Sequence, residues 1–207
     1  MKNKNKKTKT LSSSKKPLVI LLTGVPGTGK TSLSREWCTQ SNWAYLSLND
    51  LVKAEGLHSG TDERSGALVV DMDKLEAAAN AWLSAVHSPV IIEGHLGCDL
   101  KLKVDRVLVL RLHPDEVASR LRARNYNAYQ LEENKMAELL DYCTLRSIRN
   151  YGARKVYELD LSGKTLQQSV SALLEFSQAA KPSADFKPHV NWSSALLAHI
   201  AQNVKDE

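Results

Sequence analysis

A glycine-rich run near the N-terminus carries the clearest chemical signal in this 207-residue chain. Residues 24–31 read Gly-Val-Pro-Gly-Thr-Gly-Lys-Thr and match the pattern G-x-x-x-x-G-K-[ST], between an expected strand and an expected helix. In such a loop the backbone N–H groups converge on phosphate oxygens, and the helix N-terminus adds partial positive charge. The pattern predicts that ATP is bound by eight residues: Gly24, Pro26, Gly27, Thr28, Gly29, Lys30, Thr31 and Ser32.

Two of these side chains have a specific place in the expected chemistry. Lys30 is expected to reach the β and γ phosphates, and the Thr31 hydroxyl is expected to ligate Mg²⁺. A glycine turn that only connects a strand to a helix does not need this Lys-Thr pair. The loop therefore predicts a soluble enzyme that binds ATP with Mg²⁺ and transfers or hydrolyses its terminal phosphoryl group.

A carboxylate and a histidine follow a second apolar run, at residues 89–92. A phosphate site needs another group that orients magnesium, normally at the end of a neighbouring buried strand. Glu93 is predicted to do this, acting on Mg²⁺ through water, and His95 in the following glycine-punctuated loop is predicted to face the phosphates. Asp99 is an alternative carboxylate, and an isolated loop histidine is often only a hydrogen-bonded surface residue.

Arginines gather where the helix expected at 114–122 gives way to a polar stretch. Arg120 and Arg124 are four residues apart and are predicted to share a helical face, from which both would close over the transferring phosphoryl group. Solvated surface charge is the alternative explanation of this cluster. Arg146 and Arg149, late in the next expected helix, are either further lid cations or partners of the helix C-terminal dipole, and we favour the second interpretation.

Alternating strands and helices must position these groups. Short apolar runs predict strands at 18–23, 44–48, 90–93, 107–110 and 156–159, and apolar spacing of three and four predicts helices at 31–40, 73–85, 114–122, 130–150 and 166–179. Buried strands that alternate with helices indicate a parallel sheet covered on both faces. The expected fold class is therefore α/β, a P-loop NTPase.

The two ends of the chain differ from this core in composition. The formal net charge is +5, and seven lysines within residues 1–16 contribute +7, which leaves −2 for the remainder. Residues 1–16 are predicted to be a disordered lysine-rich tail, which either contacts rRNA phosphates or only aids solubility. Residues 181–207 are predicted to be an extension with a short amphipathic helix around Trp192 and Ile200, which either docks on the domain or binds a partner.

Composition also argues against several classes of protein. Cys38, Cys98 and Cys143 are far apart, odd in number and without a C-x-x-C pair, which indicates neither a disulfide framework nor a zinc site. Free thiols fit a reducing cytoplasm. No apolar run approaches the roughly 18 residues that a membrane-spanning helix needs. A cytoplasmic protein without membrane contact is expected, and a nuclear pool as well if the source is eukaryotic.

Four motifs in a fixed order resemble one family. They are Leu-Leu-Thr-Gly-x-Pro-Gly-Thr-Gly-Lys-Thr at 21–31, Leu-Asn-Asp-Leu-Val-Lys at 48–53, Glu-Gly-His with Gly-Cys-Asp at 93–99, and Arg-Leu with Arg-Asn-Tyr at 120–126. From about residue 18 to 179 the combination resembles the adenylate kinase isoenzyme six family. These are archaeal and eukaryotic adenylate-kinase-like ATPases, also described as coilin-interacting nuclear ATPases.

The resemblance implies a nucleoside-monophosphate-kinase-like domain at 17–180, with a parallel five-stranded sheet, an acceptor region near 49–72 and a lid near 120–135. It implies adenylate kinase activity, ATP with AMP giving two ADP, and ATP hydrolysis linked to small ribosomal subunit maturation through a platform ribosomal protein. The alternative is a ribosome-assembly ATPase, or an RNA- or ribosomal-protein-binding factor, with little AMP kinase activity. The implied catalytic residues are Lys30, Glu93, His95, Arg120 and Arg124, and the implied AMP contacts are Asp50, Lys53 and Arg64.

The sequence departs from the family pattern at three places. Glu93 stands where the family has Asp, so the arm to magnesium is one methylene longer, and Leu96 is an additional residue after His95. Lys53 stands where family members often have arginine, which exchanges a planar fork for a point charge. Arg64 is the residue expected to supply the missing guanidinium.

Overall fold

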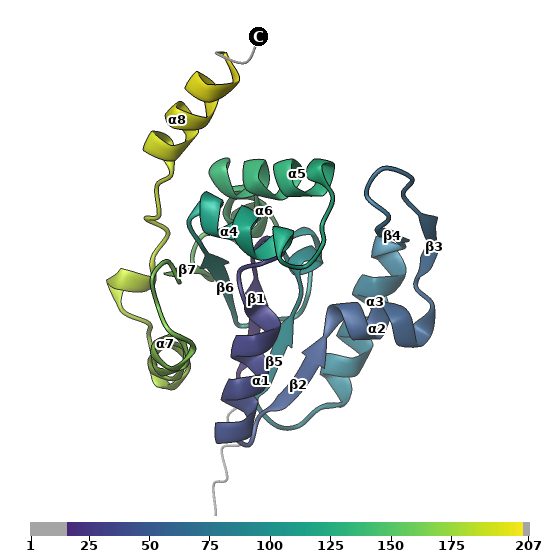
Figure 1. Ribbon diagram of the computed structural model, residues 1–207. Coiled ribbons are helices and arrows are strands. Elements are labelled where there is room, and N and C mark those ends of the chain that lie inside the picture. The colour runs from purple at the N-terminus through teal and green to yellow at the C-terminus, as the bar shows by residue number, and fades with distance from the viewer. Residues whose placement is uncertain (1–15, 205–207) are drawn as a thin grey trace, which may run out of the picture.

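A five-stranded parallel sheet organises the computed structural model, which describes residues 16–204 (Figure 1). The strands lie in the order β2-β5-β1-β6-β7 and all neighbouring pairs are parallel. Their bounds are β1 (Val19–Thr23), β2 (Ala44–Ser47), β5 (Val90–Glu93), β6 (Arg106–Arg111) and β7 (Val156–Asp160). The predicted fold class, a P-loop α/β domain with a five-stranded parallel sheet, is confirmed.

Helices cover both faces of this sheet. Neighbouring residues of a strand point to opposite faces, so two adjacent residues of β7 show both contacts. On β7, Tyr157 packs its ring against Phe176 of α7 (Leu166–Gln178), with ring centroids 5.1 Å apart. The next residue, Glu158, accepts a hydrogen bond from Thr144 of α6 (Tyr142–Tyr151) on the other face. Helix α1 (Lys30–Gln40) packs beside α7. Figure 1 shows the remaining helices α2 (Leu48–Glu55), α3 (Met72–Ala85), α4 (Pro114–Arg122), α5 (Ala128–Leu139) and α8 (Ser193–Asn203).

The strand register brings the ends of three strands to one edge of the sheet. Leu22 of β1 pairs with Glu93 of β5, and Ser47 of β2 pairs with the same Glu93. The glycine-rich loop leaves β1 at this edge, and the short 3₁₀ helix η1 (His95–Asp99) leaves β5 there. Parallel strands thus place residues that are far apart in the sequence around one site.

The prediction of a single helix at 130–150 is wrong, because the structure has two helices there, α5 and α6. The helical conformation is interrupted at Asp141, whose backbone is left-handed at φ 54°. The Asp141 carboxylate accepts from Nη2 of Arg111 at 2.5 Å, a contact with a distant strand that local periodicity does not reveal. Tertiary contact here overrides helical spacing.

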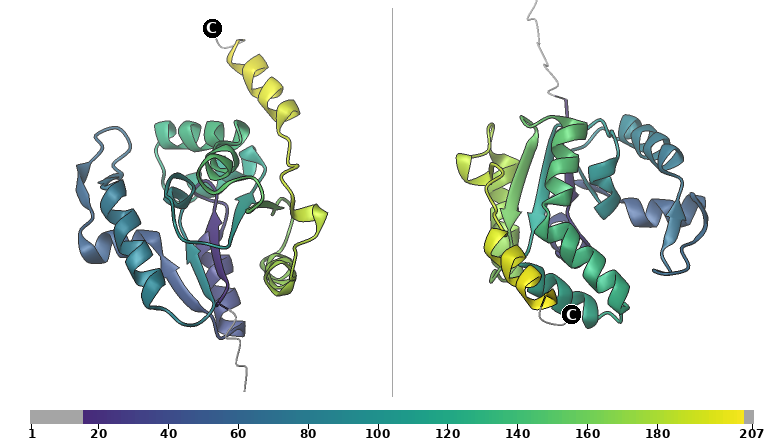
Figure 2. Two further views of the ribbon diagram at one scale, coloured as in Figure 1. Left: turned by 180° about the vertical axis from the view of Figure 1, so that it is seen from behind. Right: turned by 90° about the horizontal axis from the view of Figure 1, so that it is seen from above.

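A small antiparallel hairpin stands apart from the main sheet, and the strand prediction missed it. It consists of β3 (His58–Thr61) and β4 (Leu68–Val70), and we call residues 58–70 the hairpin arm. All four residues of β3 are exposed, so the arm lacks the apolar alternation that predicts a strand. In Figures 1 and 2 the arm lies beside the N-terminal end of α5.

The C-terminal segment crosses from α7 past β7 to the far side of the domain. The 3₁₀ helix η2 (Ala184–Phe186) packs by β7, and α8 packs against α5 (Figure 2). Between them, the backbone N–H groups of His189 and Val190 donate to Oε2 of Glu158 at 2.9 and 3.0 Å. Leu197 and Ile200 of α8 are exposed.

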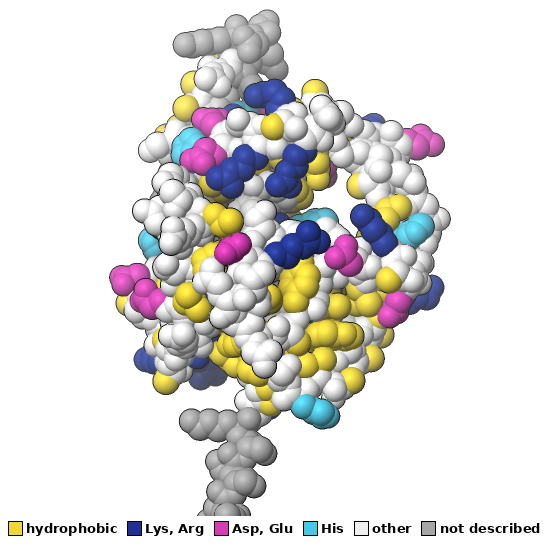
Figure 3. All heavy atoms as spheres, turned by 60° about the horizontal axis from the view of Figure 1, so that its bottom comes forward, with side chains coloured by type: hydrophobic (Ala, Val, Ile, Leu, Met, Phe, Trp, Pro, Cys, Tyr) yellow, Lys and Arg dark blue, Asp and Glu magenta, His cyan; other side chains and the backbone are white. Residues whose placement is uncertain are grey.

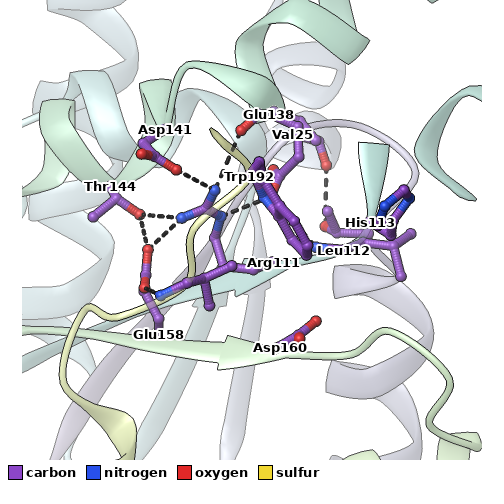
Figure 4. Close-up of polar contacts among 12 residues, drawn as sticks. Val25, Arg111, Leu112, His113, Glu138, Asp141, Thr144, Glu158, Asp160 and Trp192 are labelled. Atoms are coloured by element: carbon purple, nitrogen blue, oxygen red, sulfur yellow. Dashed lines mark hydrogen bonds and ion pairs between the residues drawn. The ribbon is translucent and has the colours of Figure 1, made fainter. Parts of the chain in front are cut away.

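Under this segment lies a buried ion-pair cluster around Arg111 (Figure 4). The Arg111 guanidinium pairs with Glu138 at 2.7 Å and with Asp141 at 2.5 Å, and it also contacts Glu158. The Trp192 ring lies 5.9 Å from the guanidinium carbon. Burial raises the pKa of Glu138, while its contact with Arg111 acts in the opposite direction.

The lysine-rich tail predicted at 1–16 lies, except for Lys16, outside the described residues. Within residues 16–204, no helix combines the length and apolar composition of a membrane span.

Candidate active site

The glycine-rich loop between β1 and α1 has a backbone that only glycine adopts easily. Gly24, Gly27 and Gly29 have φ of 135°, 91° and 95°, in the left-handed half of conformational space. A Cβ on Gly24 would lie 2.4 Å from the carbonyl oxygen of Leu110, so β6 packs directly against the loop. This close packing fixes the loop against the sheet.

A pocket opens over this loop, with an empty volume of about 550 Å³ including its mouth. Six of the eight predicted ATP-binding residues line it, together with residues from three other segments: Pro26, Gly27, Gly29, Lys30, Thr31, Ser32, Asn49, Glu93, His95, Arg124 and Tyr126. The other two predicted ATP-binding residues, Gly24 and Thr28, are buried and do not line the pocket. Gly24 packs on Leu110, and the buried Thr28 donates to the carbonyl of Val25 at 3.0 Å.

Lys30 lies buried along the loop. Its ammonium donates to the carbonyl oxygens of Gly24 at 2.8 Å and Val25 at 2.9 Å. Burial lowers the pKa of Lys30, and the nearby carboxylates of Glu93 and Glu138 act in the opposite direction. Lys30 also lines the pocket over the loop.

Glu93 ends β5 with its side chain turned to the loop, and it is almost fully buried, at 1% exposure. Its Oε1 accepts from the Thr31 hydroxyl at 3.2 Å and from the Tyr45 hydroxyl at 3.0 Å. Burial, together with the Glu93 charge, raises the pKa of Tyr45 to about 12, so this hydroxyl keeps its proton. Tyr45 is a site residue that sequence reasoning missed, because nothing in the local sequence distinguishes it from the other residues of its strand.

The oxygen donors of Thr31 and Glu93 fit Mg²⁺, with the Thr31 hydroxyl as a direct ligand and Glu93 acting through water. Magnesium prefers oxygen donors and usually combines one or two protein ligands with waters and substrate phosphates. The Thr31 hydroxyl and the Glu93 carboxylate are in contact here, and both residues line the same pocket as Lys30. Among residues 16–204, no group of three or more acidic, histidine or cysteine side chains is placed to hold a metal ion.

His95 starts η1 and lines the same pocket. Its backbone carbonyl accepts from the Thr23 hydroxyl at 3.3 Å and from the Cys98 thiol at 3.2 Å, which fix the turn. Burial, and then the charge of Lys30, lowers the pKa of His95 to about 4. The imidazole is therefore neutral near pH 7, and its unprotonated ring nitrogen can accept a hydrogen bond.

The alternative carboxylate, Asp99, is turned to other partners. It pairs with Nε of Arg146 at 2.5 Å and accepts from the Tyr142 hydroxyl at 3.1 Å. The interpretation of Arg146 as a helix-dipole partner is therefore wrong, because its guanidinium binds a carboxylate on η1. Arg149 does lie in the last turn of α6.

The prediction that Arg120 and Arg124 share a helical face is wrong, because α4 ends at Arg122 and Asn125 has a left-handed backbone at φ 60°. Both arginines nevertheless lie at the loop. Nη1 of Arg120 is 3.5 Å from the carbonyl oxygen of Gly27, and Nη2 is 3.4 Å from Glu116. Arg124 lines the pocket with Tyr126.

The three predicted acceptor residues lie outside this pocket and are exposed. Asp50 and Lys53 are on α2, which begins with Ser47 accepting from the Asp50 backbone N–H at 3.3 Å. Arg64 is in the tip of the hairpin arm. Asn49, beside Asp50, is the α2 residue that does reach the pocket, and no local sequence signal separates these two neighbours.

The fold and the loop together define a P-loop kinase-type nucleotide-binding protein. A shikimate kinase structure from Bacteroides thetaiotaomicron superposes with a TM-score of 0.54 at 16% identity, covering 78% of this chain and 99% of that one, and shows the same fold. A family model described as an AAA domain matches residues 20–141.

Archaeal relatives identify the family more closely. A protein of Methanosarcina barkeri named "Putative adenylate kinase" is 33% identical over 153 residues, 73% of this chain and 81% of that protein. A protein of the same name from Natronomonas pharaonis is 33% identical over 175 residues, 83% of this chain and 99% of that protein. The chain belongs to this adenylate-kinase-like family, which supports a nucleotide kinase function.

Proposed function

We propose that this protein is an adenylate kinase that transfers the γ-phosphoryl group of Mg²⁺-bound ATP to AMP. The observation that supports this most directly is that Lys30, Thr31 and Glu93 line one pocket over the glycine-rich loop. It provides a cation for the phosphates and two oxygen donors for Mg²⁺, with Glu93 acting through water, in one place. The names of the archaeal relatives support AMP as the acceptor.

Catalysis in this proposal comes from positioning and charge. The loop N–H groups and Lys30 would hold the donor phosphates, and Thr31, with Glu93 through water, would hold Mg²⁺, which would supply neutralisation of the phosphate charge. Arg124 already lines the pocket and Arg120 lies over Gly27, so short movements of the two guanidinium groups would place them on the transferring group.

The acceptor is proposed to enter between α2 and the hairpin arm. Asn49 lines the donor pocket from α2, and the exposed Asp50 and Lys53 follow it on the same helix. Arg64 lies on the arm. AMP bound here would present its phosphate to the donor pocket, with cationic groups of Lys53 and Arg64 available from α2 and from the arm.

A second activity, ATP hydrolysis, is favoured by the state of His95. Its side chain is neutral because of its low pKa, and it lines the pocket, so it can orient a water molecule when no acceptor is bound. Such hydrolysis is the property that would serve ribosome assembly, with a small-subunit platform protein as the proposed partner.

An RNA-binding role for the described part of the chain has less support. Figure 3 shows Lys and Arg side chains interspersed with Asp and Glu on the face it presents, rather than one continuous basic area. Direct contact with rRNA is therefore proposed for the lysine-rich tail rather than for this face.

The test is Mg²⁺-dependent ATP turnover by the purified protein with and without AMP, beside a Lys30→Ala variant, with ADP and phosphate followed separately. The proposal expects two ADP for each ATP consumed when AMP is present, little free phosphate, and loss of both products in Lys30→Ala. Phosphate release that AMP leaves unchanged would refute the kinase proposal and favour the assembly ATPase.

A further inference from the structure

Two amide side chains at the start of α5 reach across to the hairpin arm. Nδ2 of Asn127 donates to the backbone carbonyl of Arg64 at 3.0 Å, and Nε2 of Gln130 donates to the carbonyl of Ser65 at 2.6 Å. More than 60 residues of chain separate the partners in each bond. The arm and α5 are thus joined directly.

The same two side chains also cap α5, which holds their amide groups in place. Oδ1 of Asn127 accepts from the Gln130 backbone N–H, and Oε1 of Gln130 accepts from the Asn127 backbone N–H, both at 2.9 Å. This reciprocal arrangement is a capping box. Each amide therefore uses its oxygen for the helix and its NH₂ group for the arm.

The tip of the arm is shaped to present its carbonyl groups. The Asp62 carboxylate accepts from the backbone N–H groups of Arg64 at 3.2 Å and Ser65 at 2.7 Å, and from the Ser65 hydroxyl at 2.7 Å. With the N–H groups bound inside the turn, the carbonyls of residues 64 and 65 face α5. Because a two-stranded hairpin is only marginally stable alone, such external bonds matter for its position.

These bonds connect two segments of the chain that each continue from residues lining the pocket. Asn49 lines the pocket on α2, which leads through Gly56 into the arm. Arg124 and Tyr126 line the pocket on the segment that leads directly into Asn127. The contact between Asn127, Gln130 and the arm connects these two sides.

We infer that Asn127 and Gln130 form a latch between the hairpin arm and α5, and that this latch controls how tightly the acceptor nucleotide is held. The inference rests on the proposed function for the identity of the acceptor. The two residues are positioning residues. They hold the arm over the acceptor and keep Arg124 and Tyr126 beside it.

The deciding variant is Asn127→Asp combined with Gln130→Glu. Asp at the N-cap and Glu three residues later keep the oxygens of the capping box, so α5 stays capped, but both NH₂ donors are lost. Gln167→Glu with Gln168→Glu is the matched control. Gln168 occupies the same capping-box position on α7, which has no contact with the arm among those described, and the charge change is identical.

The first measurement does not depend on activity. Trypsin cleaves after arginine, and Arg64 is exposed at the arm tip with its carbonyl held by Asn127. Cleavage of the Arg64–Ser65 bond in the full chain, followed by mass spectrometry, should become about tenfold faster in the latch variant and stay unchanged in the control. Equal cleavage rates in all three proteins would overturn the latch.

The second measurement connects the latch to the acceptor. In the latch variant the KM for AMP should rise about tenfold while the KM for ATP stays within about twofold. Asn127→Ser is neutral and also caps helices, so it should raise the KM for AMP several-fold without added charge. An unchanged KM in both variants would overturn control of the acceptor. If the wild type does not phosphorylate AMP, the proposed function fails and the cleavage rates still decide the latch.

Discussion

The indole N–H of Trp192 donates to Oε1 of Glu138 at 2.9 Å, and the same oxygen accepts from Nε of Arg111 at 2.7 Å (Figure 4). Trp192, in the C-terminal segment, thereby supplies a hydrogen-bond donor to the buried Glu138 carboxylate on α5. Since α5 follows the segment of Arg124 and Tyr126, the C-terminal segment and the hairpin arm contact the same helix from different sides. His199 of α8 adds a contact with Glu132 of α5 at 2.9 Å.

Removing this indole donor should lower the stability of the protein. Trp192→Phe keeps an aromatic ring near Arg111 but leaves the buried Glu138 one hydrogen bond short, which costs about 1–3 kcal/mol. Urea unfolding followed by far-UV circular dichroism measures the loss. Trp82→Phe, a half-buried tryptophan on α3, is the control. A midpoint equal to that of the wild type would show that Trp192 contributes only its ring.

The position of the glycine loop at one edge of the sheet can be predicted from the sequence, but several of the groups that surround the loop cannot. The position of Glu93 at the end of β5 can be predicted, because a buried apolar run that ends in a carboxylate is typical of a strand end at the ligand-binding side of a parallel sheet. Tyr45 and the hydrogen bond to Glu93 depend on the order β2-β5-β1, which local patterns do not encode.

The helix break at Asp141 and the hairpin arm show a second reason why structure prediction from the sequence fails. Asp141 adopts a left-handed backbone because Arg111, 30 residues earlier, binds its carboxylate. The arm has exposed strands and depends on Asn127 and Gln130, more than 60 residues later. Where a long-range contact decides the local conformation, spacing and propensity within a window contain too little information.

The hydroxyl of Tyr45 should matter for magnesium. Tyr45→Phe removes one of the two hydroxyls that donate to Oε1 of Glu93, so the carboxylate is held less firmly beside Thr31. The Mg²⁺ concentration for half-maximal ATP turnover should rise about three- to tenfold. Tyr157→Phe, on β7 at the far edge of the sheet, should leave it unchanged. Equal Mg²⁺ dependence in both variants would contradict this role.

His95 should make stability depend on pH. Its folded-state pKa of about 4 lies below the ordinary value of 6.5, so between these values the unfolded chain binds a proton that the folded chain does not. Stability should therefore fall as pH falls from about 6.5 to about 4, and this contribution should be complete above that range. Urea midpoints at pH 7 and pH 4.5 should differ less in His95→Gln than in the wild type. His87→Gln, at an exposed site, is the control, and the same pH dependence in all three proteins would contradict a depressed pKa.

The balance between kinase and hydrolase should also depend on His95. If the neutral imidazole positions water, His95→Ala should reduce ATP hydrolysis by about a hundredfold. AMP phosphorylation should fall only a few-fold, because the acceptor oxygen is positioned by α2 and the hairpin arm instead. Phosphate release without AMP and ADP formation with AMP, measured on the same preparation, give the two rates, and Lys30→Ala should abolish both. A proportional loss of the two activities would mean that His95 supports the phosphate site as a whole, through the turn that its carbonyl shares with Thr23 and Cys98.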